Sequence, residues 1–257
     1  MSQYRHAPAE LQAIPITGID EILPGDLVAD AIVAALRRQK LKLTAGDVLV
    51  VKHKIVSKAE AAMVVLSLVR PSPAARRWAA RYGLDPRLVH LALAQGKRVV
   101  RRKHGVIITE TLHGLVCANS GIDVSNVDGG RCAVLLPADP DRSARAIRRV
   151  IKKELGVSVP VLITDSFGRP WREGLCEVAI GIAGMKPFRD FRGNRDPHGY
   201  RLRASLEAVT DELACVAGLV CGKLSRTPAC IIRGFRYQTG RGSGRQLVRP
   251  KSRDLFR

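Results

Sequence analysis

Short apolar runs alternate with amphipathic stretches along this chain of 257 residues, and we find no internal repeats or low-complexity segments. A short apolar run bounded by turn residues is typical of a buried strand, whereas apolar residues three or four positions apart are typical of a helix. A chain in which both patterns alternate has to pack helices against sheets. The sequence therefore predicts an α+β or mixed α/β fold.

Three segments have the pattern of amphipathic helices, namely residues 26–39, 139–155 and 205–220. The second begins near Asp139 or Asp141 and ends before Gly156, which are residue types favoured at helix starts and ends. The apolar positions expected to face the core are Leu27, Ile32, Val33 and Leu36 in the first helix, and Leu206, Val209, Leu213 and Val216 or Ala217 in the third.

Composition is that of a globular chain, because 46% hydrophobic residues over this length can bury a sizeable core. We predict one domain over residues 1–257, with two intimately joined subdomains as the alternative. No apolar span of about 18 residues is present, and Met1 to His6 lack the apolar region of a secretory signal. We therefore expect a cytoplasmic protein without a membrane segment. The six cysteines have no zinc-site spacing, so we expect reduced, mostly buried thiols.

The pair Asp165-Ser166 is the most informative local motif, since it follows the apolar run Val161-Leu162-Ile163 and precedes a glycine turn. A carboxylate and a hydroxyl delivered together suit hard cations such as Mg²⁺ or Mn²⁺, which usually share such ligands with substrate phosphates. Arg169 and Arg172 add positive charge that suits phosphate or carboxylate oxygens. The alternative is that Asp165 and Ser166 only form a turn or helix cap.

A second acidic loop follows the apolar run Leu115-Val116-Cys117 and offers Asp123, Ser125 and Asn126. Two strand-end loops of this kind can converge on one divalent ion and a nucleotide phosphate. The alternative is two independent Asx turns. A third segment, residues 50–60, is interpreted as a strand that ends in lysines and a serine, which also suit phosphate oxygens. Its alternative is a solvated, lysine-rich face.

Collinear motifs connect these loops. They are IPITGI at 14–19, PGDL at 24–27, GDVLVV at 46–51, KIVSKAE at 54–60, DPRLV at 85–89, HGLVCAN at 113–119, GIDVSNV at 121–127, LLPADPD at 135–141, ITDSFGRPWR at 163–172, VAIGIAG at 178–184, DELA at 211–214, GK at 222–223 and RGF at 233–235. Together they resemble the coenzyme F420-0:L-glutamate ligase family over about residues 12–257.

This resemblance implies a GTP-dependent ligase that joins L-glutamate to the carboxylate of the deazaflavin precursor F420-0, and that extends a γ-glutamyl tail in many members. It also implies the F420-0:gamma-glutamyl ligase-like fold, an intertwined homodimer and a need for Mg²⁺ or Mn²⁺, with up to two ions and K⁺ as a further candidate. The expected partners are the small molecules F420-0, L-glutamate and GTP. The point where fused relatives continue into a flavin-binding reductase falls at the end of this chain, so we expect no FMN-binding domain in it.

The resemblance also implies roles for individual residues. Asp123 and Asp165 match metal-binding carboxylates, and Ser166 matches a hydroxyl ligand to a second ion. The positions that match GTP contacts are Ile19, Asp20, Glu21, Ile22, His53, Lys58 and Asn126, with another nucleotide-lining segment from Gly222 and Lys223 to Thr227 and Pro228. The catalytic set expected from it is Asp123, Asp165 and Lys58.

Three positions depart from the family pattern. Lys223 stands where some archaeal members carry an acidic metal ligand, although the fused actinobacterial members resemble this chain in having lysine there, and this puts a ligand of the second ion in doubt. Leu175 stands at a position often held by glutamine, and His53 replaces a smaller side chain. We expect these two changes to alter nucleotide or acceptor contacts and to leave the Asp123 and Asp165 pair in place.

A net charge of +20 is only partly explained by small anionic substrates, so a basic nucleic-acid-binding protein is the alternative function. Against it, aromatic residues make up only 4% of the chain, and no zinc finger, helix-turn-helix or stacking motif is present.

Residues 187–203 are polar and basic with several glycines and a proline, which predicts a long loop. This loop either covers the acceptor substrate F420-0 or is a surface loop without a role in the site.

Overall fold

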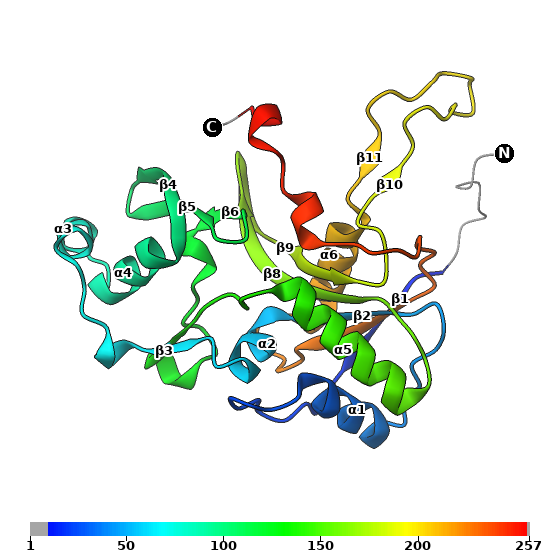
Figure 1. Ribbon diagram of the computed structural model, residues 1–257, viewed down its shortest axis with the longest axis horizontal. Coiled ribbons are helices and arrows are strands. Elements are labelled where there is room, and N and C mark those ends of the chain that lie inside the picture. The colour runs from blue at the N-terminus through cyan, green and yellow to red at the C-terminus, as the bar shows by residue number, and fades with distance from the viewer. Residues whose placement is uncertain (1–9, 256–257) are drawn as a thin grey trace.

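The computed structural model describes residues 10–255, so the segment Met1 to His6 and the last two residues lie outside the described part. The strands are β1 (Gln12–Ile16), β2 (Val48–Lys52), β3 (Met63–Val65), β4 (Gly96–Lys103), β5 (Val106–Thr111), β6 (Val116–Ala118), β7 (Cys132–Val134), β8 (Val161–Arg169), β9 (Arg172–Ala183), β10 (Arg189–Asp190), β11 (Leu206–Glu207) and β12 (Ala229–Arg233). The α-helices are α1 (Val28–Arg38), α2 (His53–Ala59), α3 (Pro73–Tyr82), α4 (Pro86–Gln95), α5 (Pro140–Leu155) and α6 (Val209–Cys221). The predicted mixed α/β class is confirmed (Figure 1).

The central sheet has the strand order β1-β12-β2-β8-β9. Its pairs are antiparallel except β2 with β8, which run parallel from Leu49 opposite Val161 to Lys52 opposite Thr164. Parallel strands need a long crossover connection. Here the connection between β2 and β8 contains every element from α2 to α5. The carboxyl ends of β2 and β8 consequently reach the same edge of the sheet.

Both faces of the sheet are covered, as its continuous apolar strands require. Helices α1, α2 and α5 pack on one face, where Leu49 and Val51 of β2 join their core. Helix α6 packs on the other face, where Val48 and Val50 point. Alternate residues of β2 thus point to opposite helical layers, so the first polar residues beyond Val51 also point to opposite faces.

The predicted helices 26–39 and 139–155 are confirmed as α1 and α5. The Asp139 carboxylate accepts a hydrogen bond from Arg142 N at 2.9 Å at the start of α5, and Gly156 ends it in the left-handed conformation with φ of 70°. Two inward positions were wrong: Leu27 precedes α1 and is 63% exposed, and Leu206 precedes α6 and is 40% exposed.

The third helix begins at Val209 rather than at residue 205, because Leu206 and Glu207 instead pair as β11 with β10. These two short strands close the segment that was predicted as a long loop. That segment projects from the body of the molecule in Figure 1 and contains one further bridge, between Arg195 and Arg201. The loop prediction is confirmed, whereas its role over the acceptor stays a prediction.

A smaller lobe lies at one end of the molecule, built from α3, α4 and the sheet β4-β5-β6 (Figure 1). It has a small core of its own around Ala75, Ala79, Val89 and Ile107. Strand β6 leads from this lobe back to the central sheet through the loop that contains Asp123. The division of the chain into domains stays a prediction. In residues 10–255, no helix has the length and apolar character needed to cross a membrane.

A buried ion pair joins β12 to the turn before β2. Asp47 is 1% exposed and accepts hydrogen bonds from Arg233 Nε and Nη2, both at 2.8 Å, and from Thr44 N at 2.8 Å. Burial alone would raise the pKa of Asp47, but the hydrogen bonds from Arg233 and Thr44 outweigh it and lower the pKa. Asp47 is therefore ionised in the folded protein at neutral pH.

We expect Asp47→Asn to lower the free energy of unfolding by about 2 kcal/mol at pH 7, because it leaves the Arg233 charge without its partner. Since the folded-state pKa is lowered, this contribution is present above about pH 4 and disappears as the pH falls through the folded value. Denaturant unfolding from pH 7 to pH 3 measures the difference. Asp20→Asn, in the exposed pair with Arg38, is the control and should change little. A difference that does not depend on pH would contradict the assignment.

Candidate functional site

The two central strands deliver polar residues to one edge of the sheet in different ways. Strand β2 ends at Lys52 and α2 begins at the next residue, His53. Residues 53–59 were expected in a strand end and are helical instead, so Ser57 and Lys58 lie on α2. The apolar residues of this segment pack into the core beside α1, which a helix permits and an extended strand would not.

We expected β8 to end just before Asp165, but the strand continues to Arg169. The reason is that β9 pairs with its backbone throughout, with Asp165 opposite Val178 and Ser166 opposite Glu177. The pairing register shifts after Ile163, and such bulges often re-aim side chains near functional sites. The turn comes later, at Trp171, and Arg169 and Arg172 flank it. The Arg169 side chain donates to Glu173 O at 2.8 Å.

Asp165 lies against the first residue of α2. Its Oδ1 is 3.2 Å from His53 Nε2 and accepts from Ser166 N at 2.7 Å. His53 is 2% exposed, and its Nδ1 lies 3.2 Å from Ser57 Oγ. Burial raises the pKa of the Cys117 thiol on β6 to about 12, and the Asp165 charge adds to this shift. Asp165 is thus a half-buried carboxylate between the central sheet and the lobe.

Asp123 lies against the second residue of α2. Lys54 Nζ is 2.7 Å from Asp123 Oδ2 and also donates to Ser125 O at 2.9 Å. Asp123 accepts from Ser125 N at 2.7 Å, which is the Asx turn of the alternative interpretation. Burial raises the pKa of Asp123, but the hydrogen bonds from Lys54 and Ser125 outweigh it, so the pKa is lowered. Because His53 and Lys54 are consecutive, Asp165 and Asp123 flank the same helix end.

Lys58 brings together three of the positions predicted to contact GTP. It is 9% exposed, forms an ion pair with Glu21 and donates to Asn126 O at 3.4 Å. The Asn126 side chain in turn donates to Lys223 O at 3.3 Å. The interpretation of this segment as a solvated lysine face is therefore wrong for Lys58. A buried ammonium group with one exposed acidic partner is suited to an anionic ligand.

The other predicted GTP positions differ in exposure. Asp20 is exposed and pairs with Arg38 at 3.2 Å. The side chains of Ile19 and Ile22 pack against the core of the α1 face, so they support the segment from inside. Leu175, the departure from the family pattern, is 60% exposed on β9.

Two residues that the sequence did not single out stand on the α6 face of the sheet. Lys52 Nζ lies 2.6 Å from Glu177 Oε1, and this carboxylate also accepts from Ser166 Oγ at 2.6 Å. Lys223 Nζ donates to the same Ser166 Oγ at 2.9 Å. The sequence does contain one signal for this pair, since Glu177 interrupts the apolar run of β9. A carboxylate buried in a strand needs a partner.

The donor set fits one hard cation at Asp123 and Asp165. Among residues 10–255, no three His, Cys, Asp or Glu side chains converge to hold a metal ion by themselves. Mg²⁺ does not need such a set, since it keeps several waters and usually takes one or two carboxylates together with phosphate oxygens. The two carboxylates that flank the start of α2 are therefore the residues that could hold one ion.

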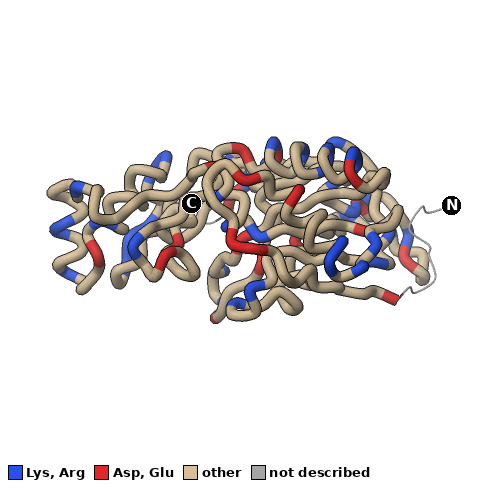
Figure 2. The backbone as a smooth tube through the Cα atoms, turned by 90° about the horizontal axis from the view of Figure 1, so that it is seen from below, with Lys and Arg blue, Asp and Glu red and all other residues tan. Residues whose placement is uncertain are grey.

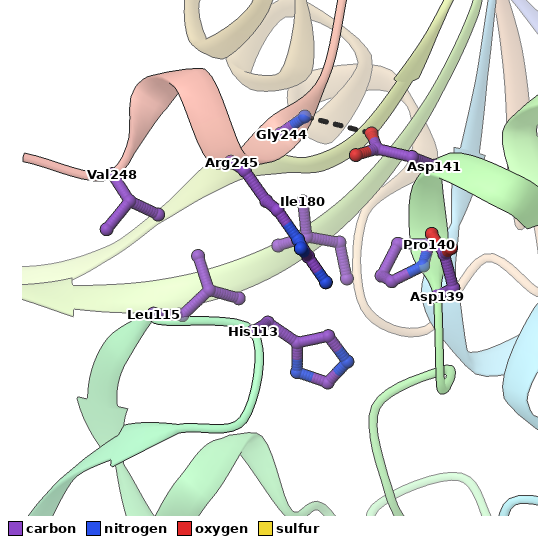
Figure 3. A pocket seen from close by; sticks show the side chains of 9 residues that line it. All are labelled: His113, Leu115, Asp139, Pro140, Asp141, Ile180, Gly244, Arg245 and Val248. Carbon is purple, nitrogen blue, oxygen red and sulfur yellow. Dashed lines mark hydrogen bonds between the residues drawn. The ribbon is translucent and has the colours of Figure 1, made fainter. Parts of the chain in front are cut away.

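A small pocket lies apart from these residues, between the start of α5 and the 3₁₀ turn Gly244–Leu247 (Figure 3). His113 and Arg245 point into it, and none of the predicted site residues lines it. His113 Nε2 donates to Pro137 O at 2.8 Å, and Asp141 accepts from Gly244 N at 2.9 Å. The first bond attaches the turn after β5 to the segment before α5, and the second attaches the C-terminal segment to α5, so we interpret the pocket as structural.

The sequence model of the family described as F420-0:Gamma-glutamyl ligase matches residues 18–234. The chain belongs to this family. A relative from Methanothermobacter thermautotrophicus named Coenzyme F420:L-glutamate ligase is 42% identical over 250 residues, which cover 96% of this chain and 99% of the relative. Relatives with the same name are 42% identical in Methanopyrus kandleri over 252 residues, 96% of this chain and 98% of the relative, and 41% identical in Methanocaldococcus jannaschii over 213 residues, 82% and 85%. The resemblance stated from the motifs is thereby confirmed.

In this member of the F420-0:gamma-glutamyl ligase family, Lys52 and Glu177 form a pair whose side chains are 19% and 10% exposed. We expect Lys52→Met to lower the free energy of unfolding by about 2–4 kcal/mol, because it leaves a buried carboxylate without its cation. A double-mutant cycle with Glu177→Gln should give a coupling energy of about 1–3 kcal/mol in urea unfolding. The exposed pair Arg37 and Glu154 is the control, with coupling below about 0.5 kcal/mol. Equal coupling in both cycles would refute the buried pair.

Proposed function

We propose that this chain is a GTP-dependent ligase that forms an amide between L-glutamate and the carboxylate of F420-0, and that can extend the product by further γ-glutamyl residues. The observation that carries the proposal is the similarity to relatives named Coenzyme F420:L-glutamate ligase, at 42% identity over 96% of the chain. The convergence of Asp123, Asp165, Lys58 and Asn126 at one sheet edge supports it.

The reaction needs an activated acceptor, because an amine cannot displace oxide from a carboxylate. We propose that an acceptor carboxylate oxygen attacks the γ-phosphorus of GTP, so that GDP leaves and an acyl phosphate forms. The glutamate nitrogen then attacks the acyl carbon, loses a proton and expels phosphate. No protein nucleophile is required, and positioning with electrostatic stabilisation suffices for this class of reaction.

The charged residues at the edge have complementary roles in this proposal. Lys58, held between Glu21 and Asn126, stabilises phosphate charge, and its burial strengthens that interaction. Asp123 and Asp165 would hold one Mg²⁺ or Mn²⁺, which would neutralise negative charge on the phosphates. Lys54 fixes the direction of the Asp123 carboxylate through its ion pair, and His53 Nε2 lies 3.2 Å from the Asp165 carboxylate. Glu21 is 72% exposed and is free to move when a nucleotide takes its place beside Lys58.

We also propose a homodimer, supported by apolar side chains that a lone chain leaves exposed. Trp171 and Leu175 on the β8–β9 hairpin are 79% and 60% exposed, and Leu219 and Leu224 at the end of α6 are 87% and 90% exposed. Large exposed apolar side chains from neighbouring elements are typical of an interface. Sedimentation of the wild type and of Trp171→Ser tests this, since a monomeric wild type would refute the dimer.

One assay tests the proposed function. The purified protein is incubated with F420-0, L-glutamate, Mg²⁺ or Mn²⁺, and GTP or ATP, and the product masses are read. Mass increases by glutamyl units, stronger with GTP, are expected, and no increase under any combination would refute the ligase.

For the nucleic-acid alternative, Figure 2 shows Lys and Arg spread over the whole molecule rather than gathered in one stripe. Tight binding to random duplex at physiological salt would instead favour that alternative.

We expect Asp165→Asn and Asp123→Asn each to lower kcat by about 100-fold or more, because each removes a carboxylate charge at the phosphate site with almost no change in size. Turnover and melting temperature are measured on the same preparations. Asp30→Asn, on the exposed face of α1, is the matched control and should retain full activity. If these two residues only form turns, the melting temperature falls and turnover per folded molecule stays the same.

We expect Lys58→Met to lower kcat by about 100-fold if the ammonium group acts mainly on the transition state. If the group binds GTP equally in the ground state, KM for GTP rises and kcat is unchanged. Lys152→Met, at the exposed end of α5, is the control for loss of one lysine charge. A change of less than about twofold in both constants of Lys58→Met would remove Lys58 from the site.

A further inference from the structure

Ser166 is the hydroxyl for which the family resemblance implies a second metal ion, and its hydrogen bonds leave little room for one. Ser166 Oγ donates its proton to Glu177 Oε1 at 2.6 Å and accepts from Lys223 Nζ at 2.9 Å. A hydroxyl has one proton and two acceptor lone pairs. One of the two lone pairs is therefore already directed at a cation.

The charges around Ser166 also disfavour a divalent ion. Glu177, the carboxylate that accepts from Ser166 Oγ, is already paired with Lys52 at 2.6 Å. The Ser166 hydroxyl therefore lies between a carboxylate that already has its cation and the Lys223 ammonium group. An ion on the remaining lone pair of Ser166, at the usual Mg²⁺ distance, would lie about 4 Å from the Lys223 ammonium group. At that distance a divalent ion and an ammonium group repel each other strongly.

The backbone holds Lys223 in this place. Helix α6 ends at Cys221, and Gly222 then adopts φ of 56° and ψ of −170°, a conformation open essentially only to glycine. The carbonyl group of Lys223 accepts from the Asn126 side chain at 3.3 Å, which ties the segment to the loop of Asp123. Lys223 is therefore aimed at Ser166 by a fixed turn rather than by chance contact of a long side chain.

We propose that the ammonium group of Lys223 takes the place of a second metal ion, so that this chain works with one divalent ion, held at Asp123 and Asp165. The inference rests on the proposed function for the nature of the ligand. A fixed ammonium group gives phosphate oxygens a positive charge and hydrogen-bond donors without a metal. The donor set at Ser166 does not fit a second ion, whereas the set at Asp123 and Asp165 fits the first.

The number of Mn²⁺ ions bound per chain tests the proposal without turnover. Equilibrium dialysis is carried out with the full chain and one equivalent of a non-hydrolysable GTP analogue. The wild type should bind one Mn²⁺ per chain, and Asp165→Asn should weaken that binding at least tenfold. Lys223→Glu should bind a second Mn²⁺, because it replaces the ammonium group with a carboxylate beside Ser166. Lys223→Glu combined with Ser166→Ala should return to one ion.

Lys152→Glu is the matched control, since it makes the same charge change on an exposed side chain at the end of α5, away from the proposed site. It should bind one ion, and unchanged melting temperatures show that every variant is folded. A wild type that binds two ions or none would overturn the proposal, and so would a Lys223→Glu variant that still binds one. A wild type that binds one ion and forms no glutamyl product refutes the proposed function instead, so the two failures are distinguishable.

Discussion

The parallel pairing of β2 with β8 is the constraint on which the rest of the structure depends. It buries Val50 against Leu162 and Val51 against Ile163 with helices on both faces, and it brings two carboxyl strand ends to one edge. In open sheets of this kind, ligands bind beyond the carboxyl ends of parallel strands. Asp165 reaches that edge on β8 and Lys58 on the helix after β2, whereas Asp123 comes from the loop after β6 and Lys223 from the turn after α6.

Compensation of charge decides how those residues are arranged. Lys52, Lys54, Lys58 and Lys223 each have an oxygen partner, and the carboxylates of Asp123, Asp165 and Glu177 each face a lysine or histidine. Buried charges are stable only when they are paired in this way. With Glu21 included, the four lysines stand beside four carboxylates, so the formal charges at the edge balance. The remaining basic surplus is spread over the molecule (Figure 2) and has no local explanation in the site.

The loop that carries Asp123 is held in an unusual backbone conformation. Asn119, Ser120, Asn126 and Asp128 all have positive φ. Asparagine and aspartate tolerate this conformation, whereas serine does so only when its surroundings hold it. Ser120 is held, because its hydroxyl donates to Ala92 O at 2.6 Å and lies 2.7 Å from Thr109 Oγ1 inside the lobe. The lobe thus anchors the loop, which links a structural element far from the sheet edge to the position of Asp123.

The sequence by itself determined the features whose causes are local. The helix over residues 140–155 follows from its apolar spacing, the Asp139 cap and Gly156, and the buried strands follow from apolar runs. The family followed from motifs in their order along the chain. Asp123 and Asp165 stood out because a carboxylate after an apolar run is informative without knowledge of its neighbours. Apart from the order of the motifs, these signals lie within about one turn or one strand of the residue concerned.

Only the tertiary structure decided what depends on distant partners. Strand β8 continues past Asp165 because β9 pairs with it, and Leu206 belongs to a strand because β10 lies beside it. The segment after Lys52 is a helix because its apolar residues find the core of the α1 face. The pairs of Lys52 with Glu177 and of Lys223 with Ser166 join residues far apart along the chain. Such contacts leave no local pattern, since neither residue of a pair constrains the sequence around the other.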